Sequence, residues 1–318
     1  MKARVGVLCN SDSGRVRSRM PEVRALCRRI AGANYVEVDG ATMGGPLVAE
    51  LLAQQPELLV VVGGDGTLHA VLGQLLAPGR TGPTPAVLAV PAGTTNMSAL
   101  DLGVRGRPLA VLERLRARLE QEAAASLPGR PRPILQVSGV APAPLCGMFF
   151  GAGIIARGVE YFSSYVRTSG VTGELASGLV MARFLGALLG AGRGDLTAPV
   201  YADIDGMEGV AGRQAFMAII ASVADRLLLG TRPYWGTGPG PIHATTVRAQ
   251  PARLLASVLP VLRGRGASLR AQDGYASANV HSLAMNLEGP FAIDGQMYAA
   301  NGARVILGTA GPVHFVCV

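Results

Sequence analysis

Residues 58–68 read LLVVVGGDGTL, a short apolar run that stops at two glycines. The apolar run does not alternate with polar residues, which is typical of a strand covered on both faces. Glycines let the backbone turn tightly and let a ligand come close. A helix beginning at Gly66 would point free N–H groups and its positive dipole end at that ligand. The stretch predicts a phosphate-binding loop beside a carboxylate, Asp65.

Two interpretations of this loop stay open. Asp65 could simply be the N-cap of the following helix, a position that Asp favours, and glycine-rich turns also occur in α/β domains that bind no nucleotide. The loop contains neither the Walker pattern G-x-x-x-x-G-K-[ST] nor the dinucleotide pattern G-x-G-x-x-G. If it binds phosphate, it belongs to another class of loop.

Strands and helices alternate around this loop. Strands are predicted at 4–9, 35–38, 58–62 and 86–90, and helices at 21–31, 46–54, 68–76, 97–102 and 109–119. This alternation predicts a parallel, doubly wound sheet with right-handed crossovers. Ligands of such sheets bind outside the carboxyl ends of the strands. The polar loops at 10–15, 63–67 and 91–96 all lie at such ends.

The pattern of predicted elements changes after residues 127–133, a proline-rich stretch that predicts a linker. Short apolar strands then follow at 134–140, 145–151, 199–204, 214–221, 242–248, 281–287, 290–294 and 303–309, with helices within 172–191 and at 251–263. We therefore expect an α/β domain over 1–127, to which the last strands can return. A mostly antiparallel β-sandwich domain is expected over 134–318.

Composition narrows the class of protein. The apolar fraction of 49% over 318 residues is enough for sizeable cores. The most apolar later stretches, 178–192 and 214–230, are interrupted by charged residues, so no transmembrane helix is predicted. The four cysteines, Cys9, Cys27, Cys146 and Cys317, show no metal or disulfide spacing and indicate buried thiols in a reducing compartment.

The chain is basic, with a net charge of +8. Lys2 is the only lysine among 29 basic residues, so the other 28 are arginine. A codon bias towards arginine would explain this, and so would a face that binds anionic lipid or phosphate. Nucleic acid is not expected as a partner, because aromatic residues are only 5% of the chain and no basic run is interleaved with them.

A second candidate lies near the end of the chain. Residues 291–296 read FAIDGQ, and Asp-Gly between two apolar runs is a strong hairpin signal. Taken alone, Asp294 is therefore interpreted as a turn residue.

Three motifs in this order, GGDGT at 63–67, PAGTTN at 91–96 and IDG at 293–295, resemble the diacylglycerol kinase catalytic-domain family. That family includes bacterial lipid kinases, sphingosine kinases and ceramide kinases. Residues 10–14 resemble its first phosphate-side loop, and FFGAG at 149–153 resembles the first strand and turn of its β domain. GGDGT alone is shared with NAD kinases and phosphofructokinases.

The resemblance implies two domains, the first like that of NAD kinases and phosphofructokinases, with ATP in the cleft between them. It implies transfer of the γ-phosphate of Mg²⁺–ATP (or Mn²⁺–ATP) to a hydroxyl of diacylglycerol, ceramide or a sphingoid base. Asp294 would be the general base. Asp65 would be a metal ligand and would help to order Mg²⁺–ATP near the transferred phosphate. Residues expected to bind the nucleotide are Asn10, Gly14, Gly63, Gly64, Asp65, Gly66, Thr67, Gly93, Thr94 and Asn96. A cytoplasmic protein, peripheral to the inner face of the membrane, is expected.

The chain departs from the family pattern at several carboxylates. His69 and Ala70 stand where the family often has Asn-Glu, Met97 where it usually has Asp, and Gln296 where it commonly has Glu. These departures indicate a divergent subfamily with different metal handling, or a weakened kinase. The alternatives to a lipid kinase are a kinase of soluble substrates of the NAD kinase type, and a nucleotide- or lipid-binding protein without turnover. The sequence also leaves the oligomeric state open.

Overall fold

The computed structural model describes residues 4–40, 45–169, 186 and 198–318, and it divides into two compact units. Unit 1 comprises Met1–Ile134 and Gly311–Val318, and unit 2 comprises Leu135–Ala310. The chain therefore passes from one unit to the other twice, within strands β5 (Gly129–Ser138) and β15 (Arg304–Val316).

Unit 1 is built on a parallel sheet. Its strands are β1 (Val5–Asn10), β2 (Tyr35–Val38), β3 (Leu58–Gly63) and β4 (Ala86–Pro91), in the spatial order β2-β1-β3-β4. The end of β15 continues the sheet parallel to β4, with Phe315 opposite Val87. Every residue of β3 is buried, as the unbroken apolar run predicts.

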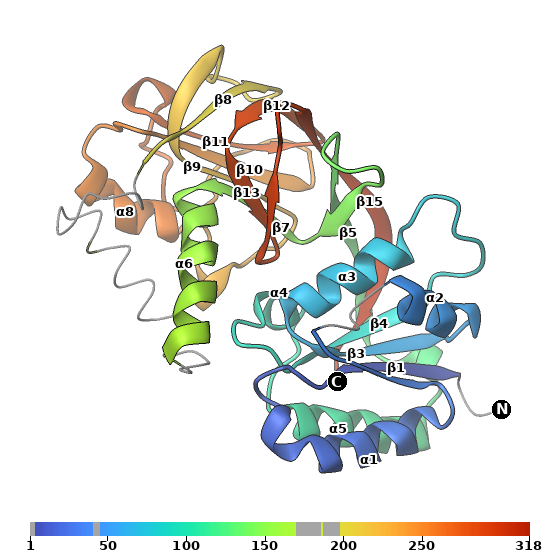
Figure 1. Ribbon diagram of the computed structural model, residues 1–318. Helices are drawn as coiled ribbons and strands as arrows, with labels where there is room; N and C mark the ends of the chain where they lie inside the picture. Colours follow the sequence, from blue (N-terminus) through green and yellow to red (C-terminus); the bar gives the residue numbers. More distant parts are fainter. Residues whose placement is uncertain (1–3, 41–44, 170–185, 187–197) are drawn as a thin grey trace. The chain divides into compact units, whose positions relative to one another are not determined.

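Helices cover both faces of this sheet (Figure 1). They are η1 (Arg17–Arg19), α1 (Met20–Ala31), α2 (Gly45–Ala53), α3 (Asp65–Leu75), α4 (Met97–Asp101), α5 (Pro108–Gln121) and η2 (Ala124–Ser126). Helices α1 and α5 pack together on one face, and α2 and α3 on the other. The predicted parallel, doubly wound α/β fold is confirmed.

Unit 2 is mostly antiparallel β structure, as predicted. It contains β6 (Leu145–Gly147), β7 (Phe149–Gly153), β8 (Val200–Asp205), β9 (Arg213–Ser222), β10 (Ile242–Arg248), β11 (Tyr275–Val280), β12 (Leu283–Glu288), β13 (Pro290–Ile293) and β14 (Gln296–Ala299). Strand β9 is central, because it pairs antiparallel with β7, β8 and β10. The helices are α6 (Ile154–Ser169), η4 (Leu228–Gly230), α8 (Leu254–Leu262) and η5 (Ala271–Asp273).

The expected linker at 127–133 is wrong as a loop, because residues 129–133 form the first half of β5. Pro131 is exposed in this strand, and an exposed strand position tolerates proline although proline has no N–H to donate. Helix α6 and strands β11 and β14 were not predicted. The helix expected within 172–191 lies outside the described residues apart from position 186. No described helix is long and apolar enough to cross a membrane.

Candidate active site in unit 1

The order of the strands in unit 1 fixes where a ligand would bind. From β1 the chain moves to β2 on one side, and it later places β3 on the other side. The crevice at the carboxyl ends of β1 and β3 is therefore the topological switch point, where open α/β sheets bind ligands. Residues 10–14 follow β1, residues 63–67 follow β3 and residues 91–96 follow β4. We call these three segments the glycine-loop site.

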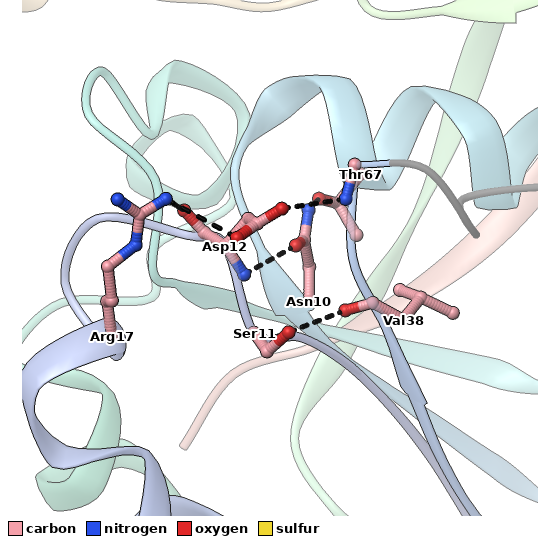
Figure 2. Close-up of polar contacts among 7 residues, drawn as sticks. Asn10, Ser11, Asp12, Arg17, Val38 and Thr67 are labelled. Carbon is pink, nitrogen blue, oxygen red and sulfur yellow. Dashed lines mark hydrogen bonds and ion pairs between the residues drawn. The ribbon is translucent and has the colours of Figure 1, made fainter.

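The first two loops are joined by side chains. The Asn10 amide Nδ2 donates to the Thr67 hydroxyl over 3.0 Å, as Figure 2 shows. Gly63 makes this contact feasible, because a Cβ at Gly63 would lie 2.4 Å from the Thr67 side chain. The side-chain amide oxygen Oδ1 of Asn10 in turn accepts from the backbone N–H of Asp12 at 3.0 Å. Asn10 therefore holds its own loop in shape while it fixes Thr67.

The first loop is also fixed to the end of β2. The Ser11 hydroxyl donates to the Val38 carbonyl at 3.1 Å, and the Asp12 carboxylate accepts from the Gly40 N–H at 2.8 Å. The Arg17 guanidinium pairs with Asp12 at 3.4 Å, and both side chains are exposed. Arg17 is thus engaged by Asp12. The Arg15 backbone N–H reaches the third loop, where it donates to the Ala92 carbonyl at 3.0 Å.

The Asp65 carboxylate joins the second loop to the third. Its oxygens accept three hydrogen bonds: from the Thr95 hydroxyl at 2.6 Å, the Met97 N–H at 3.0 Å and the Ser98 N–H at 2.8 Å. Asp65 is not the N-cap of α3, where Gly64 holds that position, so the capping interpretation is wrong for this helix. It satisfies instead the free N–H groups at the start of α4. Sequence reasoning missed Thr95, although it lies in the PAGTTN motif.

The second and third loops also meet backbone to backbone. A Cβ at Gly93 would lie 2.4 Å from the Cα of Gly64, and one at Gly64 would lie 3.1 Å from the Cα of Gly93. Asn96 locks this contact, since its amide accepts from the Gly93 N–H at 2.7 Å and donates to the Gly93 carbonyl at 2.8 Å. Asn96 is buried and adopts a positive φ of 50°, which Asn tolerates better than most residues.

The structure therefore brings most of the predicted nucleotide-binding residues together through contacts within and between the loops. The contacting residues are Asn10, Gly63, Gly64, Asp65, Thr67, Gly93 and Asn96. Gly14 is exposed, with room for a Cβ, and Gly66 and Thr94 are half-buried. Several glycines and polar side chains of the motif thus build the scaffold of the loops.

Asp294 lies in unit 2, at the turn of the β13–β14 hairpin that Asp-Gly predicts. Both turn residues have positive φ, 47° at Asp294 and 85° at Gly295, as a type I′ turn requires. The side chain is nonetheless only 4% exposed. Its carboxylate accepts from the backbone N–H groups of Met148 and Phe149 at 2.9 and 3.0 Å. A Cβ at Gly147 would lie 2.4 Å from one of its oxygens.

In the part of the chain that the structure describes, no three His, Cys, Asp or Glu side chains are grouped so that they could hold a metal ion. Asp65, the predicted ligand, has its carboxylate engaged by α4.

Fold and site together define a doubly wound α/β unit with three glycine-rich loops at its switch point, joined to an antiparallel β unit. Residues 4–126 match the model of the diacylglycerol kinase catalytic domain, which confirms the resemblance for this part of the chain. No curated protein matches the chain in sequence.

Solved structures agree with this fold over nearly the whole chain. A Bacillus anthracis protein provisionally named a diacylglycerol kinase aligns with a TM-score of 0.59 and 14% identity, over 99% of this chain and 97% of that one. A diacylglycerol kinase from the same organism aligns with a TM-score of 0.55 and 14% identity, over 98% and 96%. At such low identity these alignments establish the fold, and the match of residues 4–126 supports a kinase.

Proposed function

We propose that the chain is an ATP-dependent lipid kinase, which transfers the γ-phosphate of ATP to a hydroxyl of a lipid such as diacylglycerol, ceramide or a sphingoid base. The observation that carries the proposal is the glycine-loop site. Its three loops are joined at the switch point of the sheet, within the residues that match a kinase family.

In this proposal, unit 1 binds Mg²⁺–ATP. The first-turn N–H groups of α3 bind phosphate oxygens, because they have no acceptor within the helix and the helix dipole favours an anion there. Asp65 acts as a positioning residue, since its hydrogen bonds to Thr95 and to the start of α4 hold the third loop against the second. Phosphoryl transfer depends mainly on positioning and on charge neutralisation, so a rigid set of loops suits it.

Asp294 is the proposed general base. The N–H groups of Met148 and Phe149 fix the position and orientation of its carboxylate. Asp294 would take the hydroxyl proton while the hydroxyl oxygen bonds to the γ-phosphorus and ADP leaves. The proton then passes from Asp294 to solvent.

A binding protein without turnover is the second candidate. Met97 and Gln296 favour it, because both stand where a kinase of this family usually has a carboxylate, and the described residues contain no metal-holding cluster. Such a protein would bind ATP and transfer no phosphate.

The test is transfer of labelled γ-phosphate from ATP to a panel of hydroxylated lipids in mixed micelles, with NAD as a soluble acceptor. We expect labelled lipid with the wild type and a rate about 10²–10⁴-fold lower for Asp294→Asn. Asn keeps the turn, because Asn-Gly also suits a type I′ hairpin. Asp203→Asn, a half-buried carboxylate on β8, is the matched control and should keep the wild-type rate.

The outcomes separate the candidates. Full activity in Asp294→Asn contradicts the general-base role and leaves the kinase intact. Label on NAD alone identifies a soluble-substrate kinase. Folded wild type that binds ATP and labels no acceptor, with Mg²⁺ or Mn²⁺, identifies the binding protein.

A further inference from the structure

Three exposed leucines lie on α8 and η4 of unit 2. Leu255 and Leu259 of α8 are 59% and 52% exposed, and Leu229 of η4 is 55% exposed. They are the most exposed large apolar side chains among the residues that the structure describes. Leu255 and Leu259 are four residues apart, so they stand on one face of the helix.

The other face of α8 anchors the helix to the unit. Leu254 and Val261 pack against a core cluster that includes Tyr275. The Tyr275 hydroxyl also donates to the carbonyl of Ala252, just before the helix, at 2.9 Å. The two leucines are therefore presented outward by a helix that is held on its opposite side.

The segment that follows the third leucine is joined to this helix by a backbone hydrogen bond. The Arg232 N–H donates to the Leu262 carbonyl at 2.8 Å, which joins the segment after η4 to the end of α8. Leu229 adopts a φ of 56° and a ψ of 24°, a left-handed conformation that is unfavourable for a branched, bulky side chain. The chain thus places an apolar side chain in solvent although the backbone conformation there is strained.

Arginines flank these leucines in the sequence. Residues 226–232 and 252–270 contain six arginines and no aspartate or glutamate, a charge of +6 in a chain whose net charge is +8. All six are exposed: Arg226, Arg232, Arg253, Arg263, Arg265 and Arg270. Segments that carry both exposed leucines and exposed arginines are complementary to a surface that is anionic outside and apolar beneath.

We propose that α8 and η4 form a docking surface for an anionic lipid bilayer. The leucines enter the boundary between headgroups and acyl chains, and the arginines contact lipid phosphates. This goes beyond the proposed kinase, because bilayer binding requires no catalysis, and it would bring the enzyme to a membrane-resident acceptor.

Vesicle co-sedimentation tests the proposal. We expect the wild type to bind vesicles of equimolar phosphatidylcholine and phosphatidylglycerol at least about tenfold more tightly than vesicles of phosphatidylcholine alone, with weaker binding at high salt. Leu255→Ser with Leu259→Ser should lower binding to the anionic vesicles by about tenfold or more. Ile306→Ser, which removes an exposed apolar side chain elsewhere in unit 2, should leave binding unchanged.

A charge-matched pair tests the arginines. Arg263→Gln with Arg265→Gln should weaken binding to anionic vesicles by about tenfold or more. Arg116→Gln with Arg118→Gln on α5 changes the net charge equally and should have no effect. Equal losses in the two pairs would show that net charge alone drives binding, and the assignment to α8 would fall.

Two further readouts distinguish a bilayer-docking surface from a dimer interface and from a part of the catalytic site. Sedimentation without lipid detects a dimer, and a dimer that the leucine substitutions dissolve, in a protein that binds no vesicles, would overturn the proposal in favour of a second copy. Phosphate transfer to a water-soluble, short-chain lipid should be unchanged in the leucine variant. Vesicle binding by a wild type that phosphorylates no lipid would support docking and refute the kinase.

Discussion

Gly64 and Gly93 meet where two loops of unit 1 touch. A Cβ at Gly93 would overlap the Gly64 backbone, and a Cβ at Gly64 would lie tightly against Gly93. Neither glycine has a positive φ, so space and not conformation requires glycine there. Asn96 and Asp65 then fix the contact with buried hydrogen bonds. The contacts of these four residues therefore hold the second and third loops of the glycine-loop site together.

Gly93→Ala should destabilise unit 1 by about 1–3 kcal/mol, because the new methyl group would overlap the Gly64 backbone. It should also weaken ATP binding, since the loops must move apart. Urea unfolding and titration calorimetry measure the two effects.

Gly73→Ala is the control, because a Cβ there meets nothing within 4 Å and the residue lies inside α3. It should stabilise the protein by about 0.5–1 kcal/mol and leave ATP binding unchanged. Wild-type ATP affinity in Gly93→Ala would contradict the role given to the contact.

The sequence predicts well which residues lie together in the site, and it predicts less well the role of each residue. The motifs place Asp65, Asn96 and Asp294 among the candidates, and the structure buries all three. Their partners come from far along the chain: Met148 is 146 residues from Asp294, and Ser98 is 33 residues from Asp65. No local pattern encodes such contacts, so the scaffolding roles could not be predicted.

Helix α4 and strand β5 are joined by a buried ion pair. The Arg132 guanidinium lies 2.8 Å from the Asp101 carboxylate, with side chains 8% and 1% exposed. Arg130 adds a hydrogen bond to the Asp101 carbonyl at 3.0 Å. These contacts hold the helix that follows the third glycine loop against the proline-rich strand.

Asp101→Asn should cost about 3–5 kcal/mol of stability, because it removes the carboxylate charge that pairs with the buried Arg132 guanidinium. Glu288→Gln removes one partner of the exposed pair with Arg213 and should cost no more than about 1 kcal/mol. Chemical unfolding of both variants measures the difference. Equal small losses would show that water reaches Arg132.

Elements were predictable where a single pattern dominates. The strands of unit 1 were recognised because they are continuous apolar runs that end in glycine or a polar turn. Prolines at 131 and 133 indicated a linker, but an exposed strand position tolerates proline, so the pattern misled. Helix α6 was missed because it follows directly on the glycines of β7 and contains Gly158, which are signals typical of turns.

In the molecule as a whole, unit 2 lies between two parts of unit 1 in the sequence. Residues 311–318 supply Val313, Phe315 and Val316 to the core of unit 1, where all three are buried. The sheet of unit 1 therefore contains a strand that is separated from its neighbour β4 by more than two hundred residues of chain.

Phe315→Ala should destabilise unit 1 by about 3–5 kcal/mol, as expected for a fully buried aromatic side chain. The exposed neighbour His314→Ala should have little effect. Hydrogen exchange should show reduced protection in β3 and β4, with unit 2 less affected. Equal loss of protection in both units would instead indicate that they unfold as one cooperative body.

The discontinuity of unit 1 also has a consequence for biosynthesis. A chain emerges from the ribosome with its N-terminal domains free to fold first. Here the strand that completes the sheet of the first 134 residues is translated only after all of unit 2. The nascent glycine-loop region will thus expose the edge of β4 during that interval, and chaperones that recognise unpaired strands have their longest opportunity to act there.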